Sequence, residues 1–203
     1  QGRLDTRSEA YGIELRCDSF PLNRFLPADS LGLLDLALQA GGSGFDPLRA
    51  QTRGNIRLQV NRAEFRGRDF GGVELNANLE EGQLSGRLSD RDEALRLLLL
   101  VSGTLTERKQ EVWLTGNVFD FDLAELGISP QKIGGSFALE AGASASDAGS
   151  YTARIALDSI EVRTRHRTDR IRPTSLSLSS DTTATRAKLA SGDLSLAFVS
   201  PGP

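Results

Sequence analysis

The sequence has few of the residues on which catalytic and metal sites usually depend. Cys17 is the only cysteine among the 203 residues, so the chain can form neither an internal disulfide nor a thiolate metal cage. Aromatic residues make up only 6%, and the apolar positions are therefore mainly Leu, Ile, Val and Ala. The net charge of −3 gives no general attraction to nucleic acid or anionic membranes, because both need a clustered positive field.

Long hydrophobic runs and methionine are also missing. The longest apolar run, residues 97–101, has the length of a strand and is far too short to cross a bilayer. There is no methionine, even at position 1, and no signal-peptide pattern, so we expect an excised or processed segment. With 38% hydrophobic residues, the chain can still form one large or two small folded units.

Alternation of apolar and polar residues with a period of two dominates the chain and predicts half-buried β-strands. Side chains two residues apart lie on the same face of a strand, so each run predicts one apolar and one water-facing side. Residues 97–101 are apolar throughout, and the pattern leaves the facing of this strand open. The predicted fold class is all-β.

Two short segments, residues 19–26 and 120–126, break this alternation. Each begins with a good N-cap residue and spaces apolar residues three or four apart, which predicts about two turns of helix. Gly127 stands where a left-handed helix cap is common. The sequence therefore predicts one short helix at each place.

An internal repeat is predicted when the chain is compared with itself at an offset of 101 positions, as between Phe20 and Phe121. Period-two patterns match at half of all offsets by chance, but both predicted helices also coincide at this offset. We therefore predict two tandem units, residues 1–101 and 102–203, that continue one another in a single groove.

Each unit is expected to expose an apolar stripe, which must close into a barrel, pack on a second sheet or bind something apolar. The predicted helices are too short to cover it. If the sheet forms an open trough, an acyl chain lying in it gains about 0.8 kcal/mol for each buried methylene, before ordering costs. The predicted lining consists of Leu34, Leu36, Leu38, Ile56, Leu58, Val60, Val73, Leu75, Leu84, Leu88, Leu114, Phe137, Leu139, Ile155, Leu157, Leu176, Leu178, Leu196 and Phe198.

Residues that could support catalysis or metal binding have simpler interpretations. His166 is expected in an exposed turn, and no Ser nucleophile motif accompanies it. Asp90, Asp92 and Glu93 lack the further ligands and the glycine of a Ca²⁺ loop and are expected in a solvated hairpin turn. Cys17 continues an apolar alternation and is expected to be a small buried hydrophobe. No catalytic residue, metal site or cofactor is predicted, and an enzyme is not expected.

Residues 163–172 form the one basic run of the sequence. It has no interleaved aromatic residues on which bases could stack, so nucleic acid is not an expected partner. A solvated hairpin is the simplest interpretation, with contact to anionic headgroups as an alternative. The run consists of Arg163, Arg165, Arg167, Arg170 and Arg172.

These patterns are similar to those of the AsmA-like envelope proteins, most closely the C-terminal repeat region of the TamB translocation and assembly module. The resemblance covers most of the chain. It rests on the segments FPLNRFL (20–26) and FDLAELG (121–127), on LLDL (33–36) and GSFAL (135–139), and on the closing AKLASGDLSL (187–196).

The resemblance implies a β-taco, an elongated and curved sheet with an open apolar trough and one short helix in each repeat. It also implies a periplasmic location in a longer protein that an inner-membrane anchor holds outside this segment. The implied partners are phospholipid or other acyl chains, neighbouring repeats and an outer-membrane protein of the Omp85 class. The family has no catalytic residues to carry over.

The predicted function is therefore non-enzymatic: phospholipid transport between membranes, outer-membrane protein assembly, or both. The alternative is a structural or chaperone-like scaffold that binds substrate strands at its sheet edges by β-augmentation. A glycosidase on a β-sandwich would need a carboxylate pair in a cleft, whereas the assigned inward positions are nearly all apolar.

Overall fold

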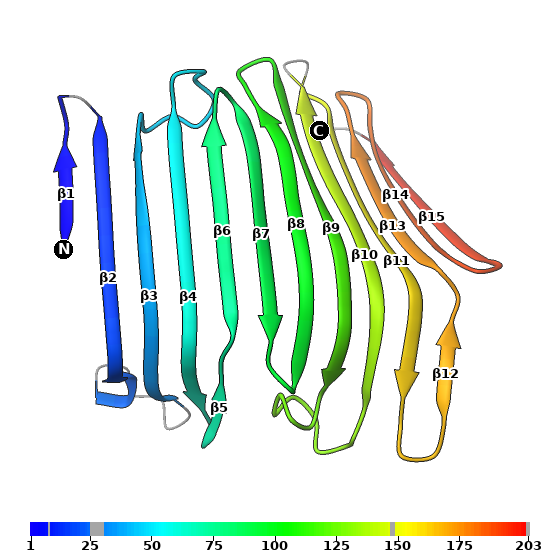
Figure 1. The fold of residues 1–203 in the computed structure, drawn as a ribbon. Coiled ribbons are helices and arrows are strands. Elements are labelled where there is room, and N and C mark those ends of the chain that lie inside the picture. Colours follow the sequence, from blue (N-terminus) through cyan, green and yellow to red (C-terminus); the bar gives the residue numbers. More distant parts are fainter. Residues whose placement is uncertain (8, 25–30, 147–148, 202–203) are drawn as a thin grey trace.

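The computed structural model describes residues 1–7, 9–24, 31–146 and 149–201, which form one antiparallel sheet (Figure 1). The strand order is β1-β2-β3-β4-β6-β7-β8-β9-β10-β11-β13-β14-β15, with β5 paired to β4 and β12 paired to β11. The all-β prediction is confirmed, and the sheet is open, ending at β1 and β15. The strands are β1 (Gly2–Asp5), β2 (Ala10–Pro21), β3 (Leu31–Ser43), β4 (Arg53–Phe65), β5 (Arg68–Phe70), β6 (Val73–Glu80), β7 (Gln83–Arg91), β8 (Leu95–Leu105), β9 (Lys109–Asp122), β10 (Gly134–Ser146), β11 (Tyr151–Arg163), β12 (Thr168–Ile171), β13 (Thr174–Ser180), β14 (Ala184–Ser191) and β15 (Leu194–Pro201).

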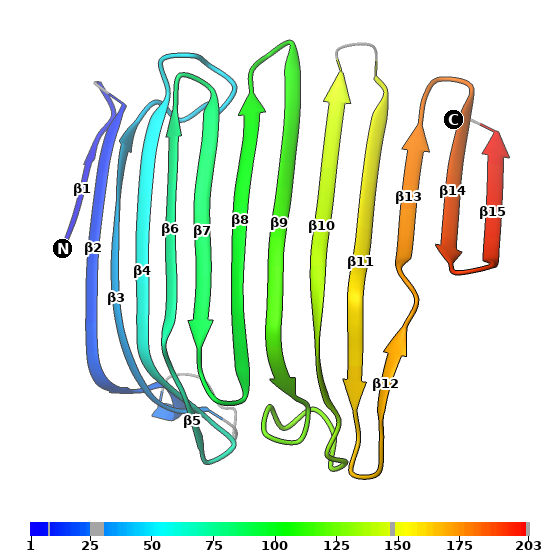
Figure 2. The same ribbon diagram turned by 45° about the vertical axis from the view of Figure 1, so that its right-hand side comes forward.

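The sheet is a single layer. Within the described residues, no second sheet and no helix packs over either face (Figures 1 and 2). The accessible surface is 13495 Å², whereas a compact protein of this size exposes about 9,300 Å². Ala94, Val118 and Ala184 are the buried hydrophobic residues of the described chain, and all three are small or medium-sized. The described part of the chain therefore has no conventional core.

Strand register separates the sheet into two chemically different faces. Residues directly opposite each other in neighbouring strands point to the same side of a sheet. Leu58 of β4, for example, lies opposite Leu38 of β3 and Leu75 of β6. Arg57 lies opposite Gln39 and Asn76 on the other side. We call the side that carries Leu58 the apolar face and the opposite side the polar face.

The same register settles the facing of the uniformly apolar run in β8. Leu99 lies opposite Leu88 of β7, so Leu97, Leu99 and Val101 belong to the apolar face. Leu100 lies opposite Arg87 and therefore points to the polar face, where its side chain is 47% exposed. The run departs from strict alternation because its polar-face positions are also leucines.

The first predicted helix is wrong. Strand β2 continues through Ser19 to Pro21 and is followed by the single 3₁₀ turn η1 (Leu22–Arg24). The rest of that predicted helix, residues 25–26, lies outside the described residues. The cause is a β-bulge, since Cys17 pairs with Leu36 but Phe20, three residues later, pairs with Leu34. Three-residue apolar spacing here reflects a bulged strand.

The second predicted helix is also wrong, because β9 runs through Asp120 to Asp122. Only one turn follows. The N–H of Leu126 donates to the Asp122 carbonyl at 2.9 Å, and the Asp122 Oδ1 accepts from the N–H of Ala124 at 2.8 Å. Gly127 has φ +70, so its predicted left-handed conformation is present without a helix before it.

The short strands β5 and β12 extend the sheet at its lower end in Figure 1, and each is followed by a bend into the next strand. Between β5 and β6, the chain turns at Gly71 and Gly72, and Gly72 has the left-handed φ of +85. The N–H of Gly71 donates to Asp92 Oδ2 at 3.1 Å, and the N–H of Ala94 donates to Asp92 Oδ1 at 2.8 Å. Asp92 therefore ties the β5–β6 bend to the β7–β8 turn.

This contact gives a stability prediction. Replacing Asp92 with Ala leaves two backbone donors without their acceptor and is expected to lower the free energy of unfolding by about 1–2 kcal/mol. The measurement is urea unfolding followed by circular dichroism. Asp193→Ala is the matched control, because the Asp193 side chain is 93% exposed in its pair with Arg172. The control should lose under about 0.5 kcal/mol, and equal losses in the two variants would contradict the assignment.

Candidate functional site

The apolar face is continuous from β2 to β15. Its central row of directly opposed residues contains no polar side chain and crosses twelve strands. At about 4.8 Å between neighbouring strands, this row is about 50 Å long. It consists of Ile13, Ala40, Ile56, Ala77, Gly86, Val101, Leu114, Ala141, Ile155, Leu176, Leu189 and Leu196.

Two flanking rows widen this strip. The upper row runs from Tyr11 to Phe198 and carries apolar residues or glycine throughout. The lower row runs from Leu15 through Leu88 to Leu157 and is then interrupted by Thr174 and Ser191 before it ends at Leu194. The register places every residue of the predicted lining on this face, and its contact with lipid remains a prediction.

Residues beyond the predicted lining also belong to the apolar face. Leu99, Val101, Ala141 and Leu189 lie opposite predicted positions on neighbouring strands. The facing of Leu99 and Val101 could not be predicted, because their run lacks alternation. The alternation around Leu189 could have identified it as an apolar-face residue from the sequence. The apolar face is thus more extensive than the sequence alone indicated.

The apolar side chains are not sealed away from solvent. Towards the C-terminal end of the sheet, Leu176 is 47% exposed, Leu196 57% and Phe198 65%. No large side chain among the described residues is fully buried. Exposed apolar areas of this length are uncommon on monomeric proteins and are typical of interaction surfaces, so the apolar face is the candidate site of this chain.

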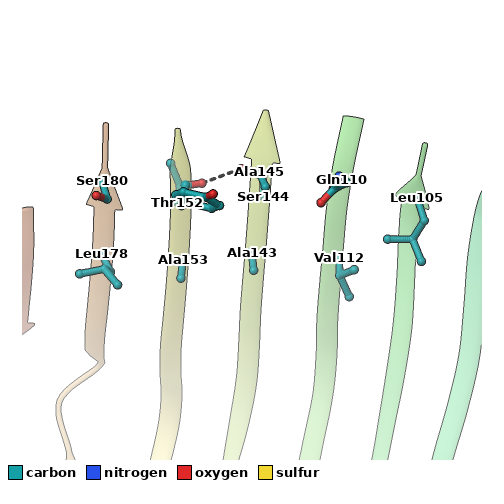
Figure 3. Close-up of a pocket in the computed structure, with 11 residues that line it drawn as sticks. Leu105, Gln110, Val112, Ala143, Ser144, Ala145, Thr152, Ala153, Leu178 and Ser180 are labelled. Carbon is teal, nitrogen blue, oxygen red and sulfur yellow. Dashed lines mark hydrogen bonds between the residues drawn. The ribbon is translucent and has the colours of Figure 1, made fainter. Parts of the chain in front are cut away.

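A hollow of about 390 Å³ lies on the apolar face near the upper ends of β8 to β13 (Figure 3). Small residues form its floor, because Ala143 of β10 lies directly opposite Ala153 of β11. Larger side chains, including Leu105, Val112 and Leu178, line it beside them. The hollow lies where these two alanines stand between the larger Val112 and Leu178 in the same row.

The corresponding place among the first strands is filled. Gly42 and Gly54 lie opposite each other in the upper row, and a side chain at Gly42 would meet the Tyr11 ring. The ring of Tyr11 stacks on that of Phe45, with 6.2 Å between their centroids. The chain therefore leaves one hollow open and covers its counterpart with its own aromatic residues.

The acidic cluster is only partly solvated, which corrects the sequence interpretation. Asp90 lies opposite Leu97 at the lower border of the apolar face and is 8% exposed. Burial raises the pKa of the Asp90 carboxyl, whose Oδ1 accepts a hydrogen bond from the N–H of Asp92 at 2.9 Å. Asp90 is buried because it occupies an apolar-face position within β7 rather than the turn itself.

The basic run is largely neutralised by local ion pairs. Arg163 pairs with Asp120, Arg172 with Asp193, and Arg167 with Asp169 at 2.7 Å. Arg170 reaches Glu161 at 3.9 Å. Arg165 makes no hydrogen bond or ion pair with any described residue. His166 lies in the exposed turn of this hairpin, as predicted.

Metal-ligating side chains do not gather in the described part of the chain, where no three His, Cys, Asp or Glu side chains are placed to hold a metal ion. Cys17 lies on the apolar face opposite Leu36 and is half-buried rather than fully buried. Among the same residues, no helix combines the length and the hydropathy that crossing a membrane requires.

Comparisons with protein-family models, with curated protein sequences and with solved structures found no significant match to the chain. The candidate site is therefore defined by its geometry alone. That geometry is an uncovered apolar strip about 50 Å long, with one open hollow and charged residues at its lower border.

The burial of Asp90 predicts a pH effect. A raised folded-state pKa means that the ionised carboxylate costs stability; this cost is absent well below pH 3.8, grows as the pH rises from 3.8 to the higher folded-state pKa, and is fully present above it. Asp90→Asn keeps an acceptor for the Asp92 N–H but removes the charge. The variant should therefore have a higher melting temperature than wild type at pH 7 and nearly the same one at pH 3. A lower melting temperature at pH 7 would contradict this assignment.

Proposed function

We propose that this chain is a non-enzymatic lipid-binding segment of a longer envelope protein, in which acyl chains lie along the apolar face. The observation that carries the proposal is the unbroken apolar row from Ile13 to Leu196, which no second layer of described residues covers. Each methylene removed from water there gains about 0.8 kcal/mol, before ordering costs. Because similar residues recur from strand to strand, a bound chain meets low barriers to sliding.

The two-unit repeat is part of this proposal. The β-bulge of β2, where Cys17 pairs with Leu36 and Phe20 with Leu34, has a counterpart in β9. There Val118 pairs with Phe137 and Phe121 with Gly135, so all four positions differ from the first set by 101. The strand lengths also recur, with a short extra strand, β5 or β12, at the same place in each half. These correspondences support a repeat of strand units in place of the predicted helix-containing ones.

The proposed cellular role rests on the resemblance to AsmA-like and TamB-like envelope proteins. In this proposal the chain is a β-taco segment in the periplasm, and the full-length protein is anchored in the inner membrane. Its partners are phospholipids, neighbouring repeats and an Omp85-class outer-membrane protein. Its function is phospholipid transport between the membranes, outer-membrane protein assembly, or both. The open single-layer sheet supports this role because it leaves the apolar face accessible along its whole length.

The lipid proposal is tested by placing charges in the apolar face. Leu36→Asp, Leu58→Asp and Leu75→Asp, combined in one chain, put three carboxylates into neighbouring strands of the strip. We expect the lipid that copurifies with the chain, measured by mass spectrometry, to fall at least about fivefold, because a buried carboxylate has a large desolvation cost.

The control carries the same charges on the polar face of the same strands: Gln39→Asp, Gln59→Asp and Asn76→Asp. It should retain wild-type lipid. Circular dichroism establishes that both variants remain folded. Unchanged lipid in the folded apolar-face variant would refute the proposal.

A scaffold that binds strands by β-augmentation is a second candidate function. The observation that favours it is β15, which forms one end of the sheet and contains no charged residue. Edge strands without charge are templates for pairing with another strand. This function uses backbone groups of the sheet edge and leaves the apolar face free.

A further inference from the structure

The hollow on the apolar face has a counterpart in the first half of the sheet. In both halves, two small residues lie directly opposite each other in the upper row. The pairs are Ala143 with Ala153 and Gly42 with Gly54. The residue on the other side of the pair is Val112 opposite Ala143 and Tyr11 opposite Gly42. Val112 and Ala143 stand 101 positions after Tyr11 and Gly42, the offset at which the two bulges also recur.

Two aromatic rings of the chain itself fill the place in the first half. A Cβ atom added at Gly42 would lie 2.8 Å from Cζ of Tyr11, so the Tyr11 ring lies directly over this glycine. The Tyr11 ring stacks on that of Phe45 with an angle of 22° between their planes. Stacked rings of this kind bury much apolar area. The first half therefore shows which shape this part of the sheet accommodates, namely two aromatic rings.

The second half lacks both rings. At the offset of 101, Val112 stands in place of Tyr11 and Ser146 in place of Phe45. The floor differs by one methyl group at each position, since alanines replace glycines. These methyl groups take up much less space than two rings, and a hollow of about 390 Å³ is left (Figure 3).

The lining of the hollow is apolar around the floor and polar at its upper border. Val112 and Leu178 stand on either side of the two alanines in the same row. The next row towards the upper ends of the strands contributes Gln110, Tyr151 and Ser180. An apolar recess with a few polar groups at one border is typical of small-molecule sites. The ligand that fits has an apolar body and one polar end.

The size of the hollow decides between one ring and two. An apolar cavity of about 150 Å³ is enough to hold benzene, whereas this hollow has about 390 Å³. A rigid two-ring body also loses less conformational freedom on binding than a flexible chain with as many carbon atoms. Size and rigidity therefore agree with the two rings that fill the counterpart.

The geometry points to a binding site, in the hollow between Val112 and Leu178, for the two-ring aromatic group of an amphipathic small molecule. A hydroxyl or carbonyl group of the ligand faces Gln110 and Tyr151, whose side chains both donate and accept hydrogen bonds. The inference rests on the proposed two-unit repeat. It goes beyond the proposed binding of acyl chains, because the ligand is a ring compound held at one place.

Naphthol, which has two fused rings and one hydroxyl group, is the probe for a first test by nuclear magnetic resonance. The full chain carries isotope-labelled alanine methyl groups. The methyl signals of Ala143 and Ala153 should shift upfield with saturation, because an aromatic ring then lies over both. Ala40 and Ala77, which lie in the central row of the apolar face, are the controls and should not move. Equal shifts of all four signals would mean unselective adsorption and would overturn the inference.

The second test closes the hollow in the way that the first half closes its own. Val112→Tyr should weaken naphthol binding at least about tenfold, because the added ring takes the place of the ligand. Ala153→Leu fills the floor from the neighbouring strand and should have the same direction of effect. Leu84→Tyr adds the same ring to the same row on β7 and is the matched control. Unchanged affinity in both hollow variants, shown to be folded by circular dichroism, would contradict the inference.

The reciprocal variant opens the filled place. Tyr11→Val combined with Phe45→Ser removes both rings above Gly42 and gives the first half the residues of the second. Calorimetry should then show two naphthol molecules bound to each chain in place of one. A folded double variant that still binds one molecule would refute the correspondence between the two places.

Two other occupants are tested with probes of their own. Decanol has as many carbon atoms as naphthol and one hydroxyl group, but it is flexible. It should shift alanine methyl signals along the whole apolar face, and a shift confined to Ala143 and Ala153 would make the hollow part of an acyl-chain site. The amide of N-acetyl-tyrosine represents an aromatic side chain of a partner protein. Tighter binding of this amide than of naphthol would replace the small molecule with a protein segment, and either result would overturn the inference.

Lipid that copurifies with the chain separates this inference from the lipid proposal. The triple variant of Leu36, Leu58 and Leu75 changes β3, β4 and β6, none of which lines the hollow. It should bind naphthol as wild type does, and loss of naphthol binding in the folded triple variant would count against a separate site. Val112→Tyr should retain wild-type lipid. Loss of that lipid would show that acyl chains occupy the hollow and would overturn the inference.

Discussion

The structure depends on the backbone hydrogen-bond ladders of one sheet, because no second layer formed by the described residues packs against the strands. In most domains, a sheet buries one face against another element. Here each strand is held by its two neighbours and by side-chain pairs such as Leu58 with Leu75. The same constraint explains the uncovered apolar face, which a conventional core would have buried.

Local alternation was sufficient to predict the strands and their faces, since a period of two is a property of neighbouring residues. It failed where a bulge shifted the phase. The step from Cys17 to Phe20 keeps both side chains on the apolar face although they are three residues apart, and Val118 to Phe121 repeats it. Such spacing imitates a helix in sequence. The error was the same in both halves because the bulge recurs at the same offset.

Features that depend on strand register could not be predicted from local pattern. The hollow exists because Ala143 meets Ala153 across two strands, and small residues in a sequence do not reveal which others lie beside them. The burial of Asp90 follows from its position opposite Leu97, although its neighbours in sequence are charged. Likewise, Arg68 and Glu125 lie 57 positions apart and meet only because the sheet brings the two turns together.

The two candidate binding modes use different atoms of the same sheet and do not compete. In the lipid proposal, an acyl chain contacts side chains of the apolar face and runs across the strands. In the strand-pairing proposal, a docking strand uses the outward N–H and C=O groups of β15 and lies parallel to the strand axes. A strand added at β15 with alternation like that of β9 would also extend the apolar face by one row position in each of its rows. A strand bound at this edge would therefore lengthen the strip on which lipid would lie. The two proposed functions would then use adjoining parts of one extended sheet.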